Sequence, residues 1–374
     1  MMAGIYIHIP FCRSKCFYCG FYSVASLSLK QSYLQALVQE MDIRQSYLGM
    51  SDISTLYFGG GTPSYLDDND FETIFSRLRK YWNFQADIEC SVEMNPEDVN
   101  EDKLQLLKSL GVNRITIGIQ SFNDRILKQI NRTHSALQAF EAVRLCQKSG
   151  FDNIGIDLII GLPGSTISDL EYDLKIVEEL NISHVSVYML SIDSNSVFEI
   201  LTRKGKLNLH SDDTLAEYYL YVSDFLKSIG YEHYEISNFA KDSRYSRHNT
   251  SYWQQIPYLG LGAAAHSYNG HSRQWNVSNL KKYIAGIDQG NMDVELELLS
   301  RKDRYNEYLM TNFRTMWGVD PLYLEVEFHD WWQGEQCRLE QYAERGLLES
   351  YNGRLRLSEK GWLLSDDIFS DLFI

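Results

Sequence analysis

Cysteine is scarce in this chain, which has 6 among 374 residues. Cys90, Cys146 and Cys337 stand singly in apolar or helical surroundings, as ordinary buried thiols do, and this does not suit a disulfide framework. Long hydrophobic runs are also missing, since no stretch approaches the roughly 20 apolar residues that span a bilayer. No basic segment followed by an apolar one opens the chain. We therefore expect a cytoplasmic protein with no intrinsic membrane anchor.

An excess of positive charge is lacking as well. The chain has 35 basic and 50 acidic residues, a formal net charge of −15. This balance disfavours nucleic acid as a partner, and it leaves no polybasic anchor for anionic lipid. Short basic groups such as Arg77, Arg79 and Lys80 are mixed with acids and are typical of solvated helix faces. The length allows one large domain and a smaller one.

Three of the cysteines fall in one window, Cys12, Cys16 and Cys19. Thiolates at this spacing can converge on one metal centre from a single loop. A four-iron, four-sulfur cube held by three thiolates keeps one iron free for a ligand, whereas structural zinc normally takes a fourth protein ligand. The window therefore favours a 4Fe–4S cluster that binds a ligand. A disulfide with a spare thiol, or zinc with His8 as fourth ligand, stays an alternative.

Apolar, β-branched runs alternate with helical periodicity through the first two-thirds of the chain. One helix is expected from the capping residue Asn100 to Gly111, and another from Ser168 through Leu180. Such units predict a parallel sheet with helices packed outside it, as an open barrel or a doubly wound sheet. The expected strands are Ile5–Ile9, Ile53–Phe58, Ile88–Val92, Arg114–Ile119, Asn153–Ile160 and His184–Leu190.

The residues that follow these strands favour the barrel. Chemistry in β/α barrels gathers at the carboxyl ends of the strands. Five consecutive strand ends carry polar or glycine-rich residues, so we predict an α/β fold built on a partial (β/α)6 barrel with its site at this rim. The segments are the cysteine loop, Gly59-Gly-Gly-Thr-Pro63, Glu93-Met-Asn-Pro96, Gln120-Ser-Phe122 and Gly161-Leu-Pro-Gly164.

The pattern changes past about residue 235. A stretch from Tyr234 to Asn276 has little periodicity, and helical segments follow near 279–289 and 301–316. Leu347–Ser350 and Arg354–Leu357 predict a hairpin. A helix followed by a hairpin resembles a winged helix, but residues 301–374 hold 9 basic and 14 acidic residues, which argues against DNA. The expected division is a core at 1–235, a connecting segment at 236–290 and a smaller α+β module at 291–374.

A cluster with one open iron needs a chelating ligand, and S-adenosylmethionine offers an amine and a carboxylate. Backbone at Gly59, Gly60 and Gly61 can approach such a ligand closely. Asp157 lies in an apolar strand, where a carboxylate needs a partner. Glu93, Gln120 and Arg132 can contact the amine, hydroxyls or carboxylate of a ligand, although each taken alone is as consistent with a solvent-facing residue.

These motifs resemble the radical S-adenosylmethionine superfamily, over essentially the whole chain. Tyr6-Ile-His-Ile-Pro-Phe-Cys12, the Cys-x₃-Cys-x₂-Cys window, Gly118-Ile-Gln-Ser-Phe122 and Asp157-Leu-Ile-Ile-Gly-Leu-Pro163 are similar to the branch of oxygen-independent coproporphyrinogen III oxidases and their relatives. The resemblance implies that Cys12, Cys16 and Cys19 ligate the cluster. It places Tyr6, Tyr18, Gly60, Gly61, Thr62, Glu93, Gln120, Arg132 and Asp157 at S-adenosylmethionine-binding positions.

Two functions occur within this branch. The oxidases carry a further cysteine where this chain has Phe21, and a long extension before the position of Tyr6. His248-Asn-Thr-Ser-Tyr-Trp253 instead resembles the His-Asn-x-x-Tyr-Trp segment of the HemW-type heme chaperones. In that group the segment is associated with heme binding. An imidazole can ligate heme iron, and Tyr252 and Trp253 can flank the macrocycle. Histidine beside aromatics is also common in ordinary packing, and His266 and His271 are weaker candidates.

The resemblance therefore implies a chaperone that passes heme to hemoproteins of the respiratory chain and carries a 4Fe–4S cluster and S-adenosylmethionine. His248 is the expected heme-binding residue. The alternative is an enzyme of porphyrin biosynthesis that decarboxylates coproporphyrinogen III. The resemblance leaves open whether S-adenosylmethionine is cleaved, and a homodimer stays among the assemblies that the sequence allows.

Overall fold

The computed structural model describes residues 2–194 and 196–374. Within these ranges, twelve strands form one sheet in the order β12-β11-β10-β9-β1-β2-β3-β4-β5-β6-β8-β7. The first six strands run parallel in chain order, as the sequence predicts. The sheet does not close, because β1 pairs next with β9 and β6 pairs next with β8. The partial barrel is confirmed, with strands β1 (Met2–Ile9), β2 (Asp52–Gly60), β3 (Phe84–Met94), β4 (Arg114–Gln120), β5 (Asn153–Ile160) and β6 (His184–Met189).

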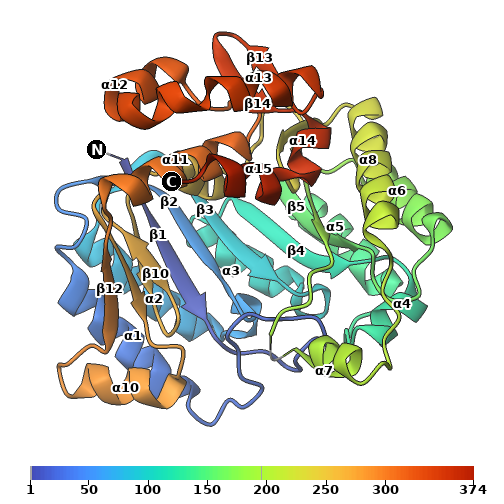
Figure 1. Cartoon of the computed structure of the whole chain (residues 1–374). Coiled ribbons are helices and arrows are strands. Elements are labelled where there is room, and N and C mark those ends of the chain that lie inside the picture. The colour runs from blue at the N-terminus through green and yellow to red at the C-terminus, as the bar shows by residue number, and fades with distance from the viewer. Residues whose placement is uncertain (1, 195) are drawn as a thin grey trace.

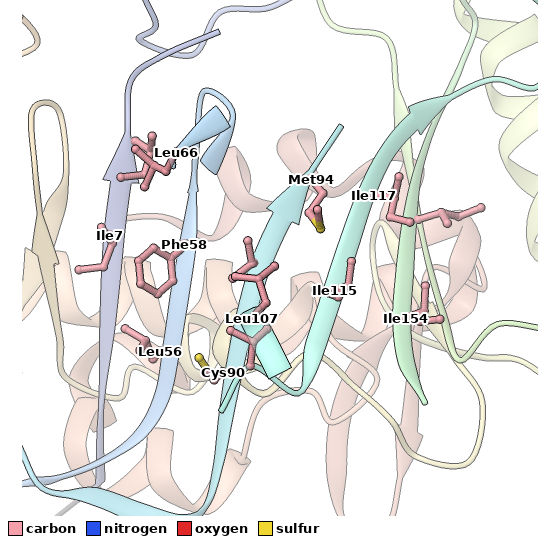
Figure 2. Close-up of a cluster of buried hydrophobic side chains, with 14 of the residues drawn as sticks. Ile7, Leu56, Phe58, Leu66, Cys90, Met94, Leu107, Ile115, Ile117 and Ile154 are labelled. Carbon is pink, nitrogen blue, oxygen red and sulfur yellow. The ribbon is translucent and has the colours of Figure 1, made fainter. Parts of the chain in front are cut away.

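The main core lies between these strands and the helices that connect them. Alternate strand residues such as Ile7 and Phe58 are fully buried in it (Figure 2). Phe58 packs on Phe71 and Phe75, with ring centroids 5.8 and 5.3 Å apart, and each such side chain contributes roughly 1.5–3 kcal/mol by burial. The helices are α1 (Lys30–Arg44), α2 (Asp68–Tyr81), α3 (Glu101–Ser109), α4 (Asp124–Gln129), α5 (Ala136–Lys148), α6 (Ile167–Leu180), α7 (Val197–Arg203) and α8 (Asp212–Ser228).

Helix boundaries follow the capping residues. The Asn100 side chain accepts a hydrogen bond from the backbone N–H of Lys103 and begins α3 as predicted. Helix α6 begins one residue before the expected Ser168, because Thr166 and Asp169 form a capping box there. It ends at Leu180, as expected.

Short elements fill the stretch that lacks periodicity. The one with most effect on the fold is β9, which pairs parallel with β1 and so extends the sheet beyond the six expected strands. Helix α9 holds His248 against the sheet, where its ring contacts Thr55 of β2. The elements are β7 (Glu232–Glu235), β8 (Asn238–Ala240), α9 (Arg247–Trp253), β9 (Tyr258–Leu261), β10 (His266–Tyr268), β11 (Ser272–Asn276) and β12 (Val294–Leu298).

A buried carboxylate ties this added part of the sheet to α1. Glu40 is 0% exposed and accepts hydrogen bonds from the Gly262 N–H, the Asn276 amide and the Tyr283 hydroxyl, each 2.7 Å long. Arg44 lies 3.6 Å away and is itself nearly buried. The carboxylate is thereby satisfied by partners that are far apart in the sequence.

The C-terminal residues form a smaller module with its own hydrophobic cluster, which runs from Tyr305 to Leu372. It lies across one end of the sheet, near the start of β1 (Figure 1). The predicted hairpin is confirmed as β13 and β14. The elements after β11, besides β12, are α10 (Leu280–Asp288), α11 (Arg301–Phe313), α12 (Pro321–Trp332), α13 (Gln336–Glu344), β13 (Leu348–Tyr351), β14 (Arg354–Leu357), α14 (Glu359–Leu363) and α15 (Ser365–Leu372).

One side chain of this module is held by three groups of the core. Glu359 of α14 accepts hydrogen bonds from Ser223 and Lys227 of α8, at 2.8 and 2.9 Å, and lies 3.3 Å from His233 of β7. These bonds outweigh burial and lower the pKa of Glu359 to about 2. The carboxylate therefore stays charged and joins the module to the core.

Candidate functional site

Two cavities lie on the face of the sheet opposite the connecting helices. Side chains alternate along β1, so Ile5, Ile7 and Ile9 pack in the helix-covered core while Tyr6 and His8 point to the other face. The first cavity, of about 370 Å³, lies at the carboxyl ends of the strands and is called the cysteine cavity below. The second, of about 870 Å³, is called the aromatic cavity. Both fall in the range of cofactor sites, about 300–1,000 Å³.

The cysteine cavity brings together most of the residues expected at the site. All three clustered cysteines line it, and they are joined by residues from the ends of β2, β3, β4 and β5. Cys16 and Arg132, which are 116 residues apart in the sequence, therefore meet at the predicted rim. The expected residues found in its wall are Cys12, Cys16, Tyr18, Cys19, Gly60, Gly61, Thr62, Glu93, Gln120, Arg132 and Asp157.

The three thiols are half-buried and free of disulfides. Burial raises the pKa of Cys12, and it raises that of Cys19 to about 11. A thiolate in this place is therefore unfavourable unless a cation offsets its charge, and an iron centre would do so. The donor set of three sulfurs around one cavity fits an iron–sulfur cube.

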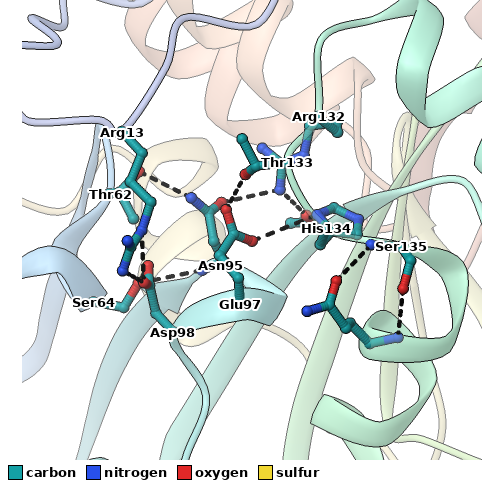
Figure 3. Close-up of polar contacts among 12 residues, drawn as sticks. Arg13, Thr62, Ser64, Asn95, Glu97, Asp98, Arg132, Thr133, His134 and Ser135 are labelled. Atoms are coloured by element: carbon teal, nitrogen blue, oxygen red, sulfur yellow. Dashed lines mark hydrogen bonds and ion pairs between the residues drawn. The ribbon is translucent and has the colours of Figure 1, made fainter.

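A chain of hydrogen bonds links two of the thiols, and Figure 3 shows its middle part, from Arg132 through Asn95 to Thr62. Arg132 donates to Asn95 Oδ1 at 2.9 Å, Asn95 Nδ2 donates to Thr62 Oγ1 at 3.2 Å, and Thr62 donates to Cys12 Sγ at 3.6 Å. Arg132 also donates to Cys16 Sγ at 3.5 Å. Donors to sulfur tune the potential of an iron–sulfur cluster, so these residues can set the properties of one held here.

Glycine is required where β2 meets the cysteine loop. At Gly60, with φ of +107°, a Cβ would lie 2.5 Å from the His8 ring. At Gly61 it would lie 2.8 Å from the carbonyl oxygens of Ile9 and Phe11. Only glycine fits both positions, and it leaves bare backbone in the wall of the cavity.

Two carboxyl groups face this space. Burial raises the pKa of Glu93 to about 7, although the Tyr57 hydroxyl donates to it at 2.7 Å. Burial likewise raises the pKa of Asp157 to about 6. Gln120 adopts a φ of +75° at the end of β4, a strained conformation of the kind that occurs at ligand sites. A ligand with a positive charge would stabilise both carboxylates.

His8 does not complete a set of metal ligands with the cysteines. Its Nε2 bonds to the Tyr22 carbonyl at 3.0 Å, and its Nδ1 lies 3.1 Å from the Tyr6 hydroxyl. Among the residues that the structure describes, no three His, Cys, Asp or Glu side chains are grouped to hold a single metal ion. With both ring nitrogens in hydrogen bonds, His8 has none free to serve as the fourth ligand of a zinc ion.

The aromatic cavity extends from the cysteine loop to α11. Tyr6 lies in its wall rather than in that of the cysteine cavity. The loop residues Lys15, Gly20, Phe21 and Ser23 line both cavities, so a single short segment separates them. The wall also contains Tyr252, Trp253, Tyr258, His266, Tyr268, Arg273 and Met310.

His248 lies beside this cavity but is enclosed. It is 1% exposed, and its Nδ1 and Nε2 lie 2.8 Å from the hydroxyls of Thr55 and Tyr252. Its ring stacks on Tyr57 with centroids 5.0 Å apart, and burial lowers its pKa to about 3. Binding of a metal by this ring would require loss of one of the two hydrogen bonds. Its role in heme binding stays a prediction.

The sequence did not single out Asn95 or Tyr57. Asn95 belongs to the strand-end segment Glu93-Met-Asn-Pro96, which was recognised as a whole, but its contact with Arg132 joins residues 37 apart. Tyr57 precedes Gly59 by two residues in an apolar strand, where it has the pattern of a core residue. Side chains alternate between the two faces of β2, and this alternation, followed toward Gly59, is the sequence signal that could have placed Tyr57 on the face of the cavities.

Comparison with known proteins agrees with this geometry. Residues 6–177 match the radical SAM superfamily, and residues 299–364 match the HemN C-terminal domain. The heme chaperone HemW of Bacillus subtilis is 35% identical over 98% of each chain. That of Lactococcus lactis is 33% identical over 99% of this chain and 97% of its own.

A solved structure shows the same fold. Coproporphyrinogen III oxidase (HemN) from Escherichia coli, a radical SAM enzyme, superposes with a TM-score of 0.85 at 26% identity. The match covers 99% of this chain and 90% of that one. With the full-length similarity to the chaperones and the cysteine-lined rim, these findings show that the chain belongs to the HemW-type heme chaperones of the radical SAM superfamily.

Proposed function

We propose that this protein binds heme and transfers it to hemoproteins of the respiratory chain. The observation that carries the proposal is the aromatic cavity, which is large, lined by tyrosines and Trp253, and adjacent to the cysteine cavity. Flat aromatic walls suit a macrocycle. The names of the related chaperones support the same activity.

A 4Fe–4S cluster would be held by Cys12, Cys16 and Cys19, and S-adenosylmethionine would occupy the rest of the cysteine cavity. The free thiols, the bare backbone at Gly60 and Gly61 and the unpartnered Nε of Arg132 fit such occupants. Once bound, the pair would supply one-electron chemistry at the sulfonium.

The protein's own residues position these groups. Glu93 and Asp157 would face the positive charge of S-adenosylmethionine, because both are buried acids. Arg132 suits the carboxylate and holds Cys16 through its hydrogen bond. Tyr18, Thr62 and Gln120 complete the wall. Tyr6 lines the aromatic cavity, and its hydroxyl contacts His8, so it would support the site from that cavity.

Heme would enter beside the His248–Trp253 segment. Tyr252 and Trp253 line the aromatic cavity, and His248 holds Tyr252 through a hydrogen bond of 2.8 Å. The proposed domain division, at residues 1–235, 236–290 and 291–374, would place this segment between the core and the C-terminal module. Heme would thus contact all three parts.

The proposed setting is the cytoplasm, a reducing compartment in which the three thiols stay available. No helix in the described part of the chain is long and apolar enough to cross a membrane. Contact with the membrane would then go through the recipient hemoprotein. Nucleic acid is not proposed as a partner, because a net charge of −15 opposes binding to a phosphate backbone. A homodimer stays a second proposal on assembly.

The alternative is oxidative decarboxylation of coproporphyrinogen III, and the superposition on the E. coli oxidase favours it. In this chain Phe21 stands where the resemblance places a further cysteine of the oxidases, and the residue is 72% exposed at the boundary of the two cavities. A phenylalanine there supplies no thiol. This residue favours the chaperone.

The deciding experiment starts with anaerobic reconstitution with iron and sulfide, followed by titration with hemin at the Soret band. We expect saturable binding of one hemin per chain and its transfer to an apo-hemoprotein. In parallel, coproporphyrinogen III and S-adenosylmethionine are supplied with a reductant. Formation of 5′-deoxyadenosine and decarboxylated product, with only nonspecific hemin binding, would contradict the chaperone.

The cluster is tested separately. Replacing Cys12, Cys16 or Cys19 with Ser should abolish bound iron and sulfide, because two thiolates do not hold the cube. Cys337→Ser is the control. The sequence predicted a buried thiol here, which is wrong, because Cys337 is exposed on α13 and lies outside the cavity wall. An unchanged iron content in any of the three variants would refute the assignment.

A further inference from the structure

The aromatic cavity offers a heme ligand that differs from His248. Two histidines, His8 and His266, are in its wall. Both ring nitrogens of His8 are already in hydrogen bonds. His266 has no hydrogen bond to either ring nitrogen among the described residues, and it is exposed on β10. Of the histidines that line or adjoin the cavity, His266 has its lone pair free.

The His266 ring is also oriented by its surroundings. It stacks on Trp275 of β11, with centroids 5.7 Å apart and planes 22° apart. Partial enclosure of the ring by the cavity wall and the charge of Arg273 lower its pKa, which favours the neutral imidazole. A neutral, oriented imidazole is the form that ligates heme iron.

The same cavity has groups that suit the two propionates of heme. Arg273 lines it, and its Nε lies 2.9 Å from Glu307, which leaves the two Nη groups for another anion. Lys15 lines it from the cysteine loop and is exposed. The indole Nε1 of Trp253 is buried without a hydrogen-bond partner in the described residues, so an occupant of the cavity could accept from it.

Aromatic side chains form much of the wall around these groups. Tyr252 and Tyr258 pack edge to face with ring centroids 4.6 Å apart. The ring centroids of Tyr258 and Tyr268 are 6.3 Å apart. Met310 of α11 adds a polarizable thioether from the C-terminal module. Rings, cations and a free imidazole thus occur together in one space.

We propose that heme occupies the aromatic cavity with His266 as an axial ligand of its iron and with Arg273 and Lys15 beside its propionates. The inference rests on the proposed heme-binding function and adds the ligand. His248 then has a structural part: it holds Tyr252 in the wall through its Nε2 and is anchored to Thr55 through its Nδ1. It is a positioning residue for the cavity.

The test uses the full-length protein with its cluster reconstituted. Hemin is titrated into the wild type and into His266→Ala, His266→Cys, His248→Ala and His271→Ala, and each complex is read by Soret absorbance and EPR. We expect His266→Ala to lose the axial-ligand signature and to raise the Kd about tenfold or more. His266→Cys should show the signature of thiolate ligation, which is a gain of signal and does not depend on weakened binding.

The controls separate the alternatives. His271 lies in the turn before β11 and outside the cavity wall, so His271→Ala should match the wild type. His248→Ala should keep the imidazole signature, since His266 is intact. Wild-type signatures in both His266 variants would overturn the inference while heme binding stands. Failure of the wild type to bind hemin stoichiometrically would overturn the proposed function itself.

Discussion

Glu93 is an acidic residue at a position where burial opposes charge. Its pKa is raised from 4.5 to about 7, so its contribution to stability is full below pH 4.5 and is lost as the pH rises through about 7. We predict that ligand-free Glu93→Gln is more stable than the wild type at pH 8 and equal to it near pH 4.5. Urea midpoints at both pH values measure this. Equal urea midpoints for the variant and the wild type at pH 8 would show that the buried Glu93 carboxylate does not destabilise the fold.

The same residue should be needed for the ligand. A cation in the cysteine cavity favours ionised Glu93 and Asp157 over their protonated forms. Glu93→Gln should therefore gain stability and weaken binding of S-adenosylmethionine, which isothermal titration measures. A variant that gains stability with unchanged affinity would place the ligand away from Glu93.

Thr62 contacts sulfur through a single hydroxyl. Thr62→Val keeps the shape of the side chain and removes the donor to Cys12 Sγ. Loss of a donor to a cluster ligand destabilises the more negative, reduced state. We predict a more negative cluster potential at unchanged iron content, measured by redox titration with EPR. Thr73→Val is the control, because its hydroxyl bonds to the Asn69 carbonyl on α2.

At the scale of single residues, the sequence predicts a shared site for residues that are close together in the chain. Cys12, Cys16 and Cys19 are seen in one window, and the wall of the cysteine cavity contains all three. Asn95 was not foreseen, because its role is a contact made only after β3 and the loop at Arg132 meet. Nor does the sequence show that both nitrogens of His248 are bonded, since Thr55 lies 193 residues away.

At the scale of elements, Glu40 joins α1 to the strands added beyond β1. Glu40→Ala would leave the Gly262 N–H and the Tyr283 hydroxyl without their acceptor and would remove the only carboxylate that pairs with Arg44 in the described residues. We predict a loss of about 3–5 kcal/mol in the free energy of unfolding, as for other broken buried ion pairs. Denaturant unfolding measures it.

The control for this variant lies two residues further along the same helix. Asp42→Ala removes a partly exposed ion pair with Arg77 and should cost less than about 1 kcal/mol. A loss for Glu40→Ala as small as that for Asp42→Ala would mean that the buried network contributes no more than a surface contact.

Long elements were predictable and short ones were not. The six parallel strands have 6 to 11 residues and carry the apolar runs that a buried strand needs. Strands β8 and β10 have 3 residues each, which is too few for a period to be seen. The pairing of β9 with β1 joins segments more than 200 residues apart, and Glu40 of α1 bonds to Gly262 directly after β9, so local sequence does not reveal it.

At the scale of the whole molecule, Glu359 joins the C-terminal module to the core. Hydrogen bonds from His233, Lys227 and Ser223 lower its pKa from 4.5 to about 2 in spite of burial. Stability from this group is present above pH 4.5 and is lost as the pH falls through about 2. We predict that Glu359→Gln costs about 1–3 kcal/mol at neutral pH and progressively less below pH 4.5.

Thermal unfolding at pH 7 and pH 3 would measure that difference. Glu349→Gln is the matched control, because its ion pair with Arg356 lies within the hairpin of the module and is partly exposed. A cost for Glu359→Gln that does not shrink toward pH 3 would assign it to packing rather than to charge.

The loop between the two cavities has a consequence for mutational tolerance. Exposed loops usually accept substitutions freely, and Phe21 is 72% exposed. Gly20, Phe21 and Ser23, however, border both cavities, so any change in them alters two walls at once. A saturation scan of this segment should therefore find it as intolerant as a buried strand, and for two separable reasons. Exposure to solvent is a poor guide to tolerance of substitution where one peptide segment separates two cavities.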